Sequence, residues 1–122
     1  MKNKGSILVI EDDIEIQEIF KMLLEQEGFS VTAVATCAEA LQFMRSDTRY
    51  SLILLDNILP DMRALEFLDK LDHDHLGAEV PVILCSGTAE LKEIKMPAQV
   101  VALLPKPFQI EDFFSAVRKF AS

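Results

Sequence analysis

The sequence has little of several features that mark common classes of protein. Its 2 cysteines, Cys37 and Cys85, lie in unrelated contexts and form no CxxC motif, so we expect reduced thiols. Only 12 lysines and arginines stand against 20 acidic residues, and a net charge of −8 without a basic stripe argues against nucleic-acid binding. The first apolar run, residues 7–10, is too short for a signal peptide or a membrane span. We therefore expect a cytoplasmic protein with no membrane contact.

The length and the apolar content of the chain indicate one folded domain. A chain of 122 residues, of which 50% are hydrophobic, is expected to be globular rather than disordered. Such a chain buries roughly two thirds of the surface that it exposes when unfolded. No linker, repeat or low-complexity stretch divides the pattern. We expect a single domain over residues 1–122, with no output domain in this chain.

Short apolar runs alternate with helical patterns along the chain. Four of the runs lack polar alternation, which is typical of strands buried on both faces of a parallel sheet. A further strand-like segment covers residues 30–35. Alternation of strands and helices with short connections favours right-handed crossovers. We therefore predict an α/β fold, a flavodoxin-like (βα)5 parallel sheet with strand order 2-1-3-4-5 and helices on both faces. The four runs are residues 7–10, 52–55, 82–85 and 100–104.

Capping and breaking residues delimit the expected helices. Asp13 is placed to cap the first helix and Gly28 to end it. Residues 36–39 form a capping box that opens a second helix, which runs through about residue 46. The third helix is expected to stop near Gly77. A fourth, over residues 88–95, is short and followed by a proline, so we expect it to be frayed or irregular.

Each of the four apolar runs stops at a residue that could handle a phosphoryl group. Because the carboxyl ends of parallel strands open into one crevice, we expect three carboxylates, a hydroxyl and an ammonium to meet there. Chance rarely places such groups together at one crevice. The five residues are Glu11, Asp12, Asp56, Ser86 and Lys106.

Four motifs around these positions resemble the receiver domain of two-component response regulators. The resemblance covers nearly the whole chain, and the motifs occur in the order and spacing of that family. It implies that a histidine kinase or a histidine phosphotransfer protein donates a phosphoryl group to an aspartate. It also implies a downstream protein target or a covalently linked output domain, and a homodimer is a further assembly that we consider. The motifs are ILVIEDD at 7–13, LLDNILPD at 54–61, ILCSG at 83–87 and LPKPF at 104–108.

The resemblance assigns a role to each residue of the expected site. Asp56 would be the phosphoacceptor, since a carboxylate can form an acyl phosphate. Mg²⁺, for which Mn²⁺ could substitute, would be bound by Asp12, Asp56 and the carbonyl of Ile58, with Glu11 acting through a water. Lys106 would supply an ammonium to a phosphoryl oxygen, and the Ser86 hydroxyl would donate to another.

Some consequences of these roles can be stated from the sequence. The domain would catalyse its own phosphorylation and dephosphorylation without being a conventional enzyme. Without the metal, mutual repulsion should raise the pKa of some of the crowded carboxylates. The family also has a cis peptide at the position of Lys106 and Pro107, and we expect one here.

The chain departs from the family pattern at three places. Position 64, usually glycine, is Ala64, which would be strained if its backbone needs a positive φ. Position 103, usually a tyrosine or phenylalanine that acts as a switch, is Leu103. The segment from Thr88 to Pro97 is short. We therefore expect a complete phosphorylation site with an unusual readout.

Other interpretations stay open at this point. A haloacid-dehalogenase-like phosphatase would need a second acid where Ile58 stands, so this class is disfavoured. A receiver-like interaction module that is regulated without phosphate is the stronger alternative, because of Leu103 and Ala64. Residues 72–75, with two aspartates and two histidines, resemble a metal cluster but are more typical of a solvated loop. We expect Cys85 to be a small buried hydrophobic residue, and Phe113 to lie in the core or an interface.

Overall fold

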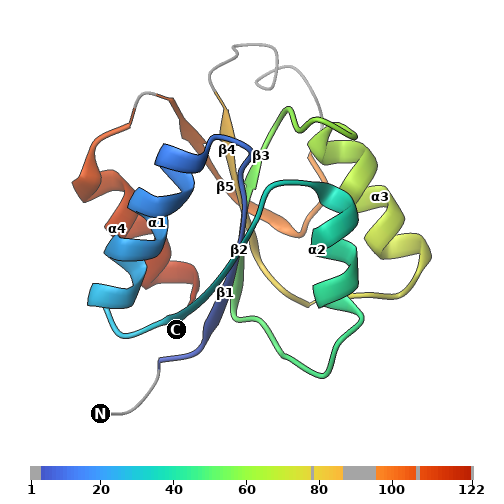
Figure 1. Ribbon diagram of the computed structural model, residues 1–122, viewed down its shortest axis with the longest axis horizontal. Helices are drawn as coiled ribbons and strands as arrows, with labels where there is room; N and C mark the ends of the chain where they lie inside the picture. Colours follow the sequence, from blue (N-terminus) through green and yellow to red (C-terminus); the bar gives the residue numbers. More distant parts are fainter. Residues whose placement is uncertain (1–3, 78, 87–95, 107, 122) are drawn as a thin grey trace.

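The apolar runs form five parallel strands in one sheet (Figure 1). The computed structural model describes residues 4–77, 79–86, 96–106 and 108–121. The strand order is β2-β1-β3-β4-β5, so the sequence-based prediction of the topology is confirmed. The strands are β1 (Ser6–Ile10), β2 (Ser30–Val34), β3 (Leu52–Asp56), β4 (Val82–Ser86) and β5 (Val100–Pro105).

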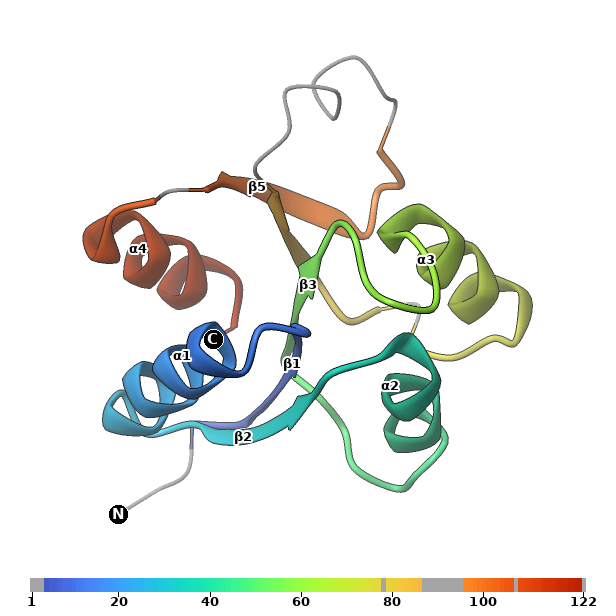
Figure 2. The ribbon, with the colours of Figure 1, turned by 45° about the horizontal axis from the view of Figure 1, so that its top comes forward.

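Helices cover both faces of the sheet. Figure 2 shows α1 and α4 on one face and α2 and α3 on the other. The expected short helix over residues 88–95 lies outside the described residues. None of the helices in the described part of the chain is long and apolar enough to span a bilayer. The helices are α1 (Ile14–Gln26), α2 (Cys37–Met44), α3 (Ala64–His73) and α4 (Ile110–Phe120).

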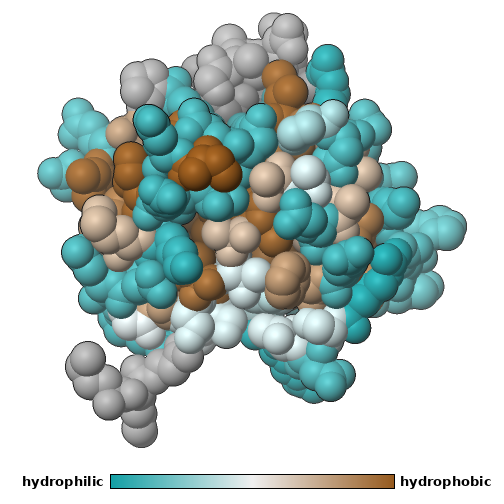
Figure 3. Space-filling model, in the orientation of Figure 1, coloured by the Kyte–Doolittle hydropathy of each residue, from teal (hydrophilic) through white to brown (hydrophobic). Residues whose placement is uncertain are grey.

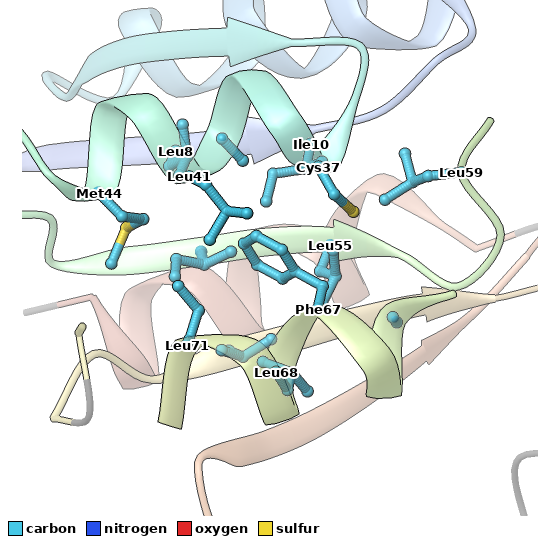
Figure 4. Packing of buried hydrophobic residues seen from close by; sticks show 14 of the residues in the cluster. Leu8, Ile10, Cys37, Leu41, Met44, Leu55, Leu59, Phe67, Leu68 and Leu71 are labelled. Atoms are coloured by element: carbon cyan, nitrogen blue, oxygen red, sulfur yellow. The ribbon is translucent and has the colours of Figure 1, made fainter. Parts of the chain in front are cut away.

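The strands divide their side chains between two hydrophobic clusters, one beneath each helical layer. Successive residues of a strand point to opposite faces, so Leu8 and Ile10 pack under α2 and α3, whereas Ile7 and Val9 pack under α1 and α4. Phe67 of α3, which is fully buried, lies at the centre of the first cluster (Figure 4). Burying both faces of the central strands in this way explains why their sequences show no polar alternation.

Three phenylalanine rings stack in the second cluster. The ring centroid of Phe20 lies 5.1 Å from that of Phe113 and 5.7 Å from that of Phe108, and Phe108 lies 5.9 Å from Phe113. The stack links α1 to α4 and to the segment that follows β5. Phe113 is therefore a core residue, as expected. Cys85 is also buried in this cluster, and burial raises the pKa of its thiol to about 12, which fits an inert hydrophobic role.

The helix ends agree with the sequence except at α3. Asp13 caps α1 by accepting hydrogen bonds from the N–H groups of Glu15 and Ile16, and Gly28 takes the left-handed conformation after its end. However, α3 ends at His73 rather than near Gly77, because His75 takes the left-handed position at φ 56° and Leu76 N–H donates back to Leu71 O at 2.8 Å. A histidine in the left-handed conformation is uncommon, so the sequence predicted the end of α3 near Gly77 instead.

Ala64 does not have the positive φ that would strain it. It is the first residue of α3, and His75 is the only non-glycine residue with a positive φ in the described part of the chain. Its methyl group is fully buried in the first cluster. The helix therefore begins here with an ordinary backbone, and alanine adds a packing contact that glycine lacks.

Candidate functional site

Acidic side chains gather where β1 and β3 end, at the carboxyl edge of the sheet. Glu11 and Asp12 follow β1, and Asp56 is the last residue of β3; β1 and β3 are neighbours, and Ile10 pairs with Leu55. Carboxylate oxygens of the three acids lie within 4.8 Å of one another, close enough to share one cation. Glu11 is only 2% exposed, Asp56 is half-buried and Asp12 is exposed. The structure thus brings Asp56 to the neighbouring residues Glu11 and Asp12, from which it is far apart in the sequence.

Lys106, which follows β5, is the cation of this cluster. Its Nζ donates a hydrogen bond to Glu11 Oε2 at 3.1 Å and lies 3.5 Å from Asp56 Oδ1. Burial alone would lower the pKa of Lys106, but its contacts with Glu11 and Asp56 outweigh burial and raise that pKa. The ammonium therefore stays charged at neutral pH, beside the carboxylate of Asp56.

Glu11 accepts hydrogen bonds at both carboxylate oxygens and at its backbone carbonyl. Its Oε1 accepts from the N–H of Asp13 at 3.2 Å, and its backbone carbonyl accepts from Gln17 Nε2 at 3.1 Å. Because its Oε2 is bonded to Lys106, both carboxylate oxygens have a donor within the protein. Burial is the main cause that raises the pKa of Glu11, and repulsion from Asp56 is the second; the Lys106 contact opposes both.

The pKa of Asp56 is raised as well. Burial is again the largest cause, opposed by Lys106 and by the backbone N–H of Asn57, whereas Asp12 adds repulsion. The sequence predicted raised carboxylate pKa values from mutual repulsion; the direction is confirmed, but desolvation is the larger cause. A bound cation would lower the free-energy cost of ionising these groups.

The loop after Asp56 forms a closed turn. Leu59 N–H donates to Met62 O at 3.3 Å, Ala64 N–H donates to Asn57 O at 2.9 Å, and Ile58 pairs with Arg63 between them. In this antiparallel pattern Ile58 and Arg63 form the pair that exchanges no backbone hydrogen bonds with each other, so the Ile58 carbonyl is directed away from Arg63. The backbone bonds described within the turn therefore do not use that carbonyl.

The position of Ser86 is described only by its backbone. Ser86 ends β4 and pairs with Pro105, the residue before Lys106, so it belongs to the same edge of the sheet. The role expected for its hydroxyl concerns a side chain that is not described. Likewise, the expected cis peptide before Pro107 lies outside the described residues.

Two further groups of residues lie outside the acidic cluster. The aspartates and histidines of residues 72–75 show no group of three metal ligands within the described chain; Asp74 instead bonds to Arg45 and to His73, each at 3.2 Å. The sequence also missed Asp61, whose carboxylate accepts hydrogen bonds from the backbone of Cys37 and Ala38 at the start of α2. No local pattern indicates this contact, because the partners are 23 and 24 residues apart in sequence.

Comparisons with known proteins agree with this geometry. Residues 7–118 match a family model described as "Response regulator receiver domain". The uncharacterized transcriptional regulatory protein YkoG of Bacillus subtilis is 33% identical over 117 residues, covering 94% of this chain and 50% of YkoG. The transcriptional regulatory protein CpxR of Escherichia coli is 30% identical over 116 residues, covering 93% of this chain and 48% of CpxR. The chain thus spans about half the length of these curated relatives.

A solved structure supports the fold. The response regulator TrrA of Thermotoga maritima, in complex with Mg²⁺ and BeF, superposes with a TM-score of 0.82 at 23% identity, and the match covers 95% of this chain and 98% of TrrA. At this identity the likeness concerns the fold alone.

Proposed function

Because the chain belongs to the response regulator receiver family, we propose that Asp56 accepts a phosphoryl group from a histidine kinase or a histidine phosphotransfer protein. The observation that carries this proposal is the cluster of three carboxylates within 4.8 Å of one another, with Lys106 Nζ 3.5 Å from Asp56. An isolated buried carboxylate would be a poor phosphoacceptor, since its charge is costly. Here a cation of the protein lies beside it. Residues 1–122 would act as one receiver domain.

The donor set fits Mg²⁺. Mg²⁺ takes oxygen ligands in octahedral geometry and usually binds one or two carboxylates directly. Both oxygens of Glu11 already accept hydrogen bonds from the protein, which favours an indirect role through a water. Asp12 and Asp56 would then be the direct ligands, together with the Ile58 carbonyl, which the backbone bonds described within the turn do not use. The cation would neutralise charge on the transferred phosphoryl group, and Mn²⁺ could take its place.

The side chains of this site suit an in-line phosphoryl transfer. An Asp56 carboxylate oxygen would attack the phosphorus, forming an oxygen–phosphorus bond as the nitrogen–phosphorus bond of the donor histidine breaks and its electron pair returns to the imidazole. Lys106 would stabilise charge on a phosphoryl oxygen, and the hydroxyl of Ser86 would donate to another. Attack by water on the acyl phosphate would release inorganic phosphate and restore the Asp56 carboxylate.

An apolar groove beside the site offers a docking surface for the phosphodonor protein. It has a volume of about 490 Å³ and shares Lys106 with the proposed phosphorylation site. Figure 3 shows hydrophobic side chains gathered over α1 and the start of α4, where Ile19 is 50% and Ile110 54% exposed. A partner that presents a histidine to Asp56 would cover this groove. The remaining lining residues are Ile16, Phe20, Leu23 and Phe108.

The output of the domain is proposed to differ from the common family pattern. Leu103 is 43% exposed on β5 and pairs with Leu84. Leucine has no aromatic ring that could rotate inward and no phenol that could form a hydrogen bond. The inward and outward positions of the Leu103 side chain should therefore differ little in free energy. We therefore expect phosphorylation to act chiefly on the loops after β3 and β4, and thereby on a downstream protein or a linked output domain.

Intact-mass analysis tests the proposed function. The protein is incubated with acetyl phosphate and Mg²⁺, and a mass gain of one phosphoryl group is expected. Asp56→Asn should gain none, since the amide cannot form the acyl phosphate. If the wild-type protein gains no phosphate while its fold is intact, the interaction module regulated without phosphate becomes the better interpretation. A gain at an undiminished rate in Asp56→Asn would place the phosphoacceptor elsewhere.

A further inference from the structure

Asp61 connects the loop after the phosphoacceptor to a distant helix. It lies five residues beyond Asp56, near the tip of the turn between β3 and α3. Its Oδ1 accepts from the N–H of Cys37 at 3.0 Å and its Oδ2 accepts from the N–H of Ala38 at 2.9 Å. Each carboxylate oxygen therefore satisfies one of the N–H groups that the first turn of α2 leaves without a helical partner.

The charge of Asp61 suits this contact. Desolvation alone would raise the pKa of Asp61, but the N–H donors of Cys37 and Ala38, with those of its own segment, outweigh it and lower that pKa. A negative charge at the N-terminus of a helix is also favoured by the helix dipole. The contact is therefore made by the ionised carboxylate at neutral pH.

Apolar packing is the other described anchor of the loop. Leu59 is 5% exposed and packs in the first hydrophobic cluster, and the partly buried Met62 packs against that cluster, but the Ile58 side chain is 54% exposed and Pro60 is exposed. Among the described residues, the backbone bonds of the tip close the turn upon itself and join it to no other element. The described hydrogen bonds that join the tip to α2 are those of Asp61.

We propose that Asp61 is a positioning residue for the cation site: by holding the turn against α2, it fixes the Ile58 carbonyl where a Mg²⁺ ion can bind it. This inference rests on the proposed function. A ligand on a turn that is free to move would lose conformational entropy on binding, so the tether should increase Mg²⁺ affinity. The same contact would make the position of α2 depend on the position of the loop that follows Asp56.

Thr36 provides a matched control. Its hydroxyl accepts from the N–H of Glu39 at 3.2 Å, so it also caps the first turn of α2 but does not reach the loop. Thr36→Ala and Asp61→Ala both remove a cap of the same helix, and only Asp61→Ala removes the tether. Asp61→Asn keeps one acceptor oxygen and serves as the milder variant if Asp61→Ala does not fold.

Calorimetric titration with Mg²⁺ alone tests the proposal. We expect Asp61→Ala to weaken Mg²⁺ binding about tenfold, Asp61→Asn to weaken it less, and Thr36→Ala to leave it within about twofold. In the metal-free proteins, the Leu59 and Ala64 amides should exchange faster in Asp61→Ala than in Thr36→Ala.

The outcomes separate this inference from the proposed function. Equal Mg²⁺ affinity in Asp61→Ala and wild type, or equal weakening by Thr36→Ala, would overturn the positioning role while leaving a working Mg²⁺ site. Failure of the wild-type protein to bind Mg²⁺ would instead overturn both.

Discussion

The ammonium of Lys106 lies 3.1 Å from the carboxylate of Glu11, although 95 residues separate them in the sequence. This contact joins the segment after β5 to the segment after β1, and Asp56 lies beside it on β3. The three groups therefore form one charged unit: Asp56 and Lys106 shift the pKa of Glu11, Lys106 shifts that of Asp56, and both carboxylates shift that of Lys106.

Replacing Asp56 by asparagine should stabilise the metal-free protein at neutral pH. The pKa of Asp56 is raised in the folded state, so ionising it costs more there than in the unfolded chain. That cost is absent well below the ordinary pKa of 3.8, and it develops as the pH rises through the folded pKa. Urea unfolding at pH 7 and at acid pH measures it: the stability gain of Asp56→Asn should shrink as the pH falls. A gain that did not depend on pH would point to packing instead.

Asp12 and Glu11 should differ in their effect on Mg²⁺ binding. Asp12→Ala removes a proposed direct ligand, and we expect a loss of affinity of more than about tenfold. Glu11→Gln keeps an oxygen that can accept from Asp13, and a water-mediated contact can be replaced, so its effect should be smaller. Titration of both variants with Mg²⁺ decides this, and equal affinities would contradict the assignment of roles.

A charged side chain in the apolar groove should slow phosphorylation by a protein donor without slowing phosphorylation by a small donor. Ile19→Asp places a carboxylate on the exposed face of α1, and we expect transfer from a phosphorylated histidine protein to slow about tenfold, as for a buried contact at an interface. Phosphorylation by acetyl phosphate should be unchanged, because that donor needs no docking surface. Single-turnover rates with the two donors measure this. Met22→Asp, on the same helix but outside the groove lining, is the control.

Phosphorylation should leave β5 nearly still. Amide exchange with and without beryllofluoride is expected to change in the loop after β3 and around Ser86, with little change at Leu103. Leu103→Tyr introduces a ring and a phenol, and should extend the change to β5. Protection changes that are concentrated at Leu103 and Leu104 in the wild-type protein, with none around Ser86, would contradict this mode of output.

The sequence predicted the sheet and the location of the acidic cluster because both depend on simple patterns. Apolar runs such as residues 52–55 mark buried parallel strands, and parallel strands bring their carboxyl ends to one edge. The end of α3 depends instead on the left-handed backbone of His75, and histidine seldom adopts that conformation. The contacts of Asp61 and the burial of Glu11 depend on tertiary neighbours, which no local pattern specifies.

The stack of Phe20, Phe108 and Phe113 has a consequence for the speed of the chemistry. Phe108 follows Lys106 by two residues, and its ring is packed between α1 and α4. The backbone that carries the ammonium is therefore ordered when the chain folds, before any donor arrives. Its conformational entropy is lost at folding and would add little to the activation barrier of the proposed phosphoryl transfer, which is the advantage of a preorganised electrostatic site.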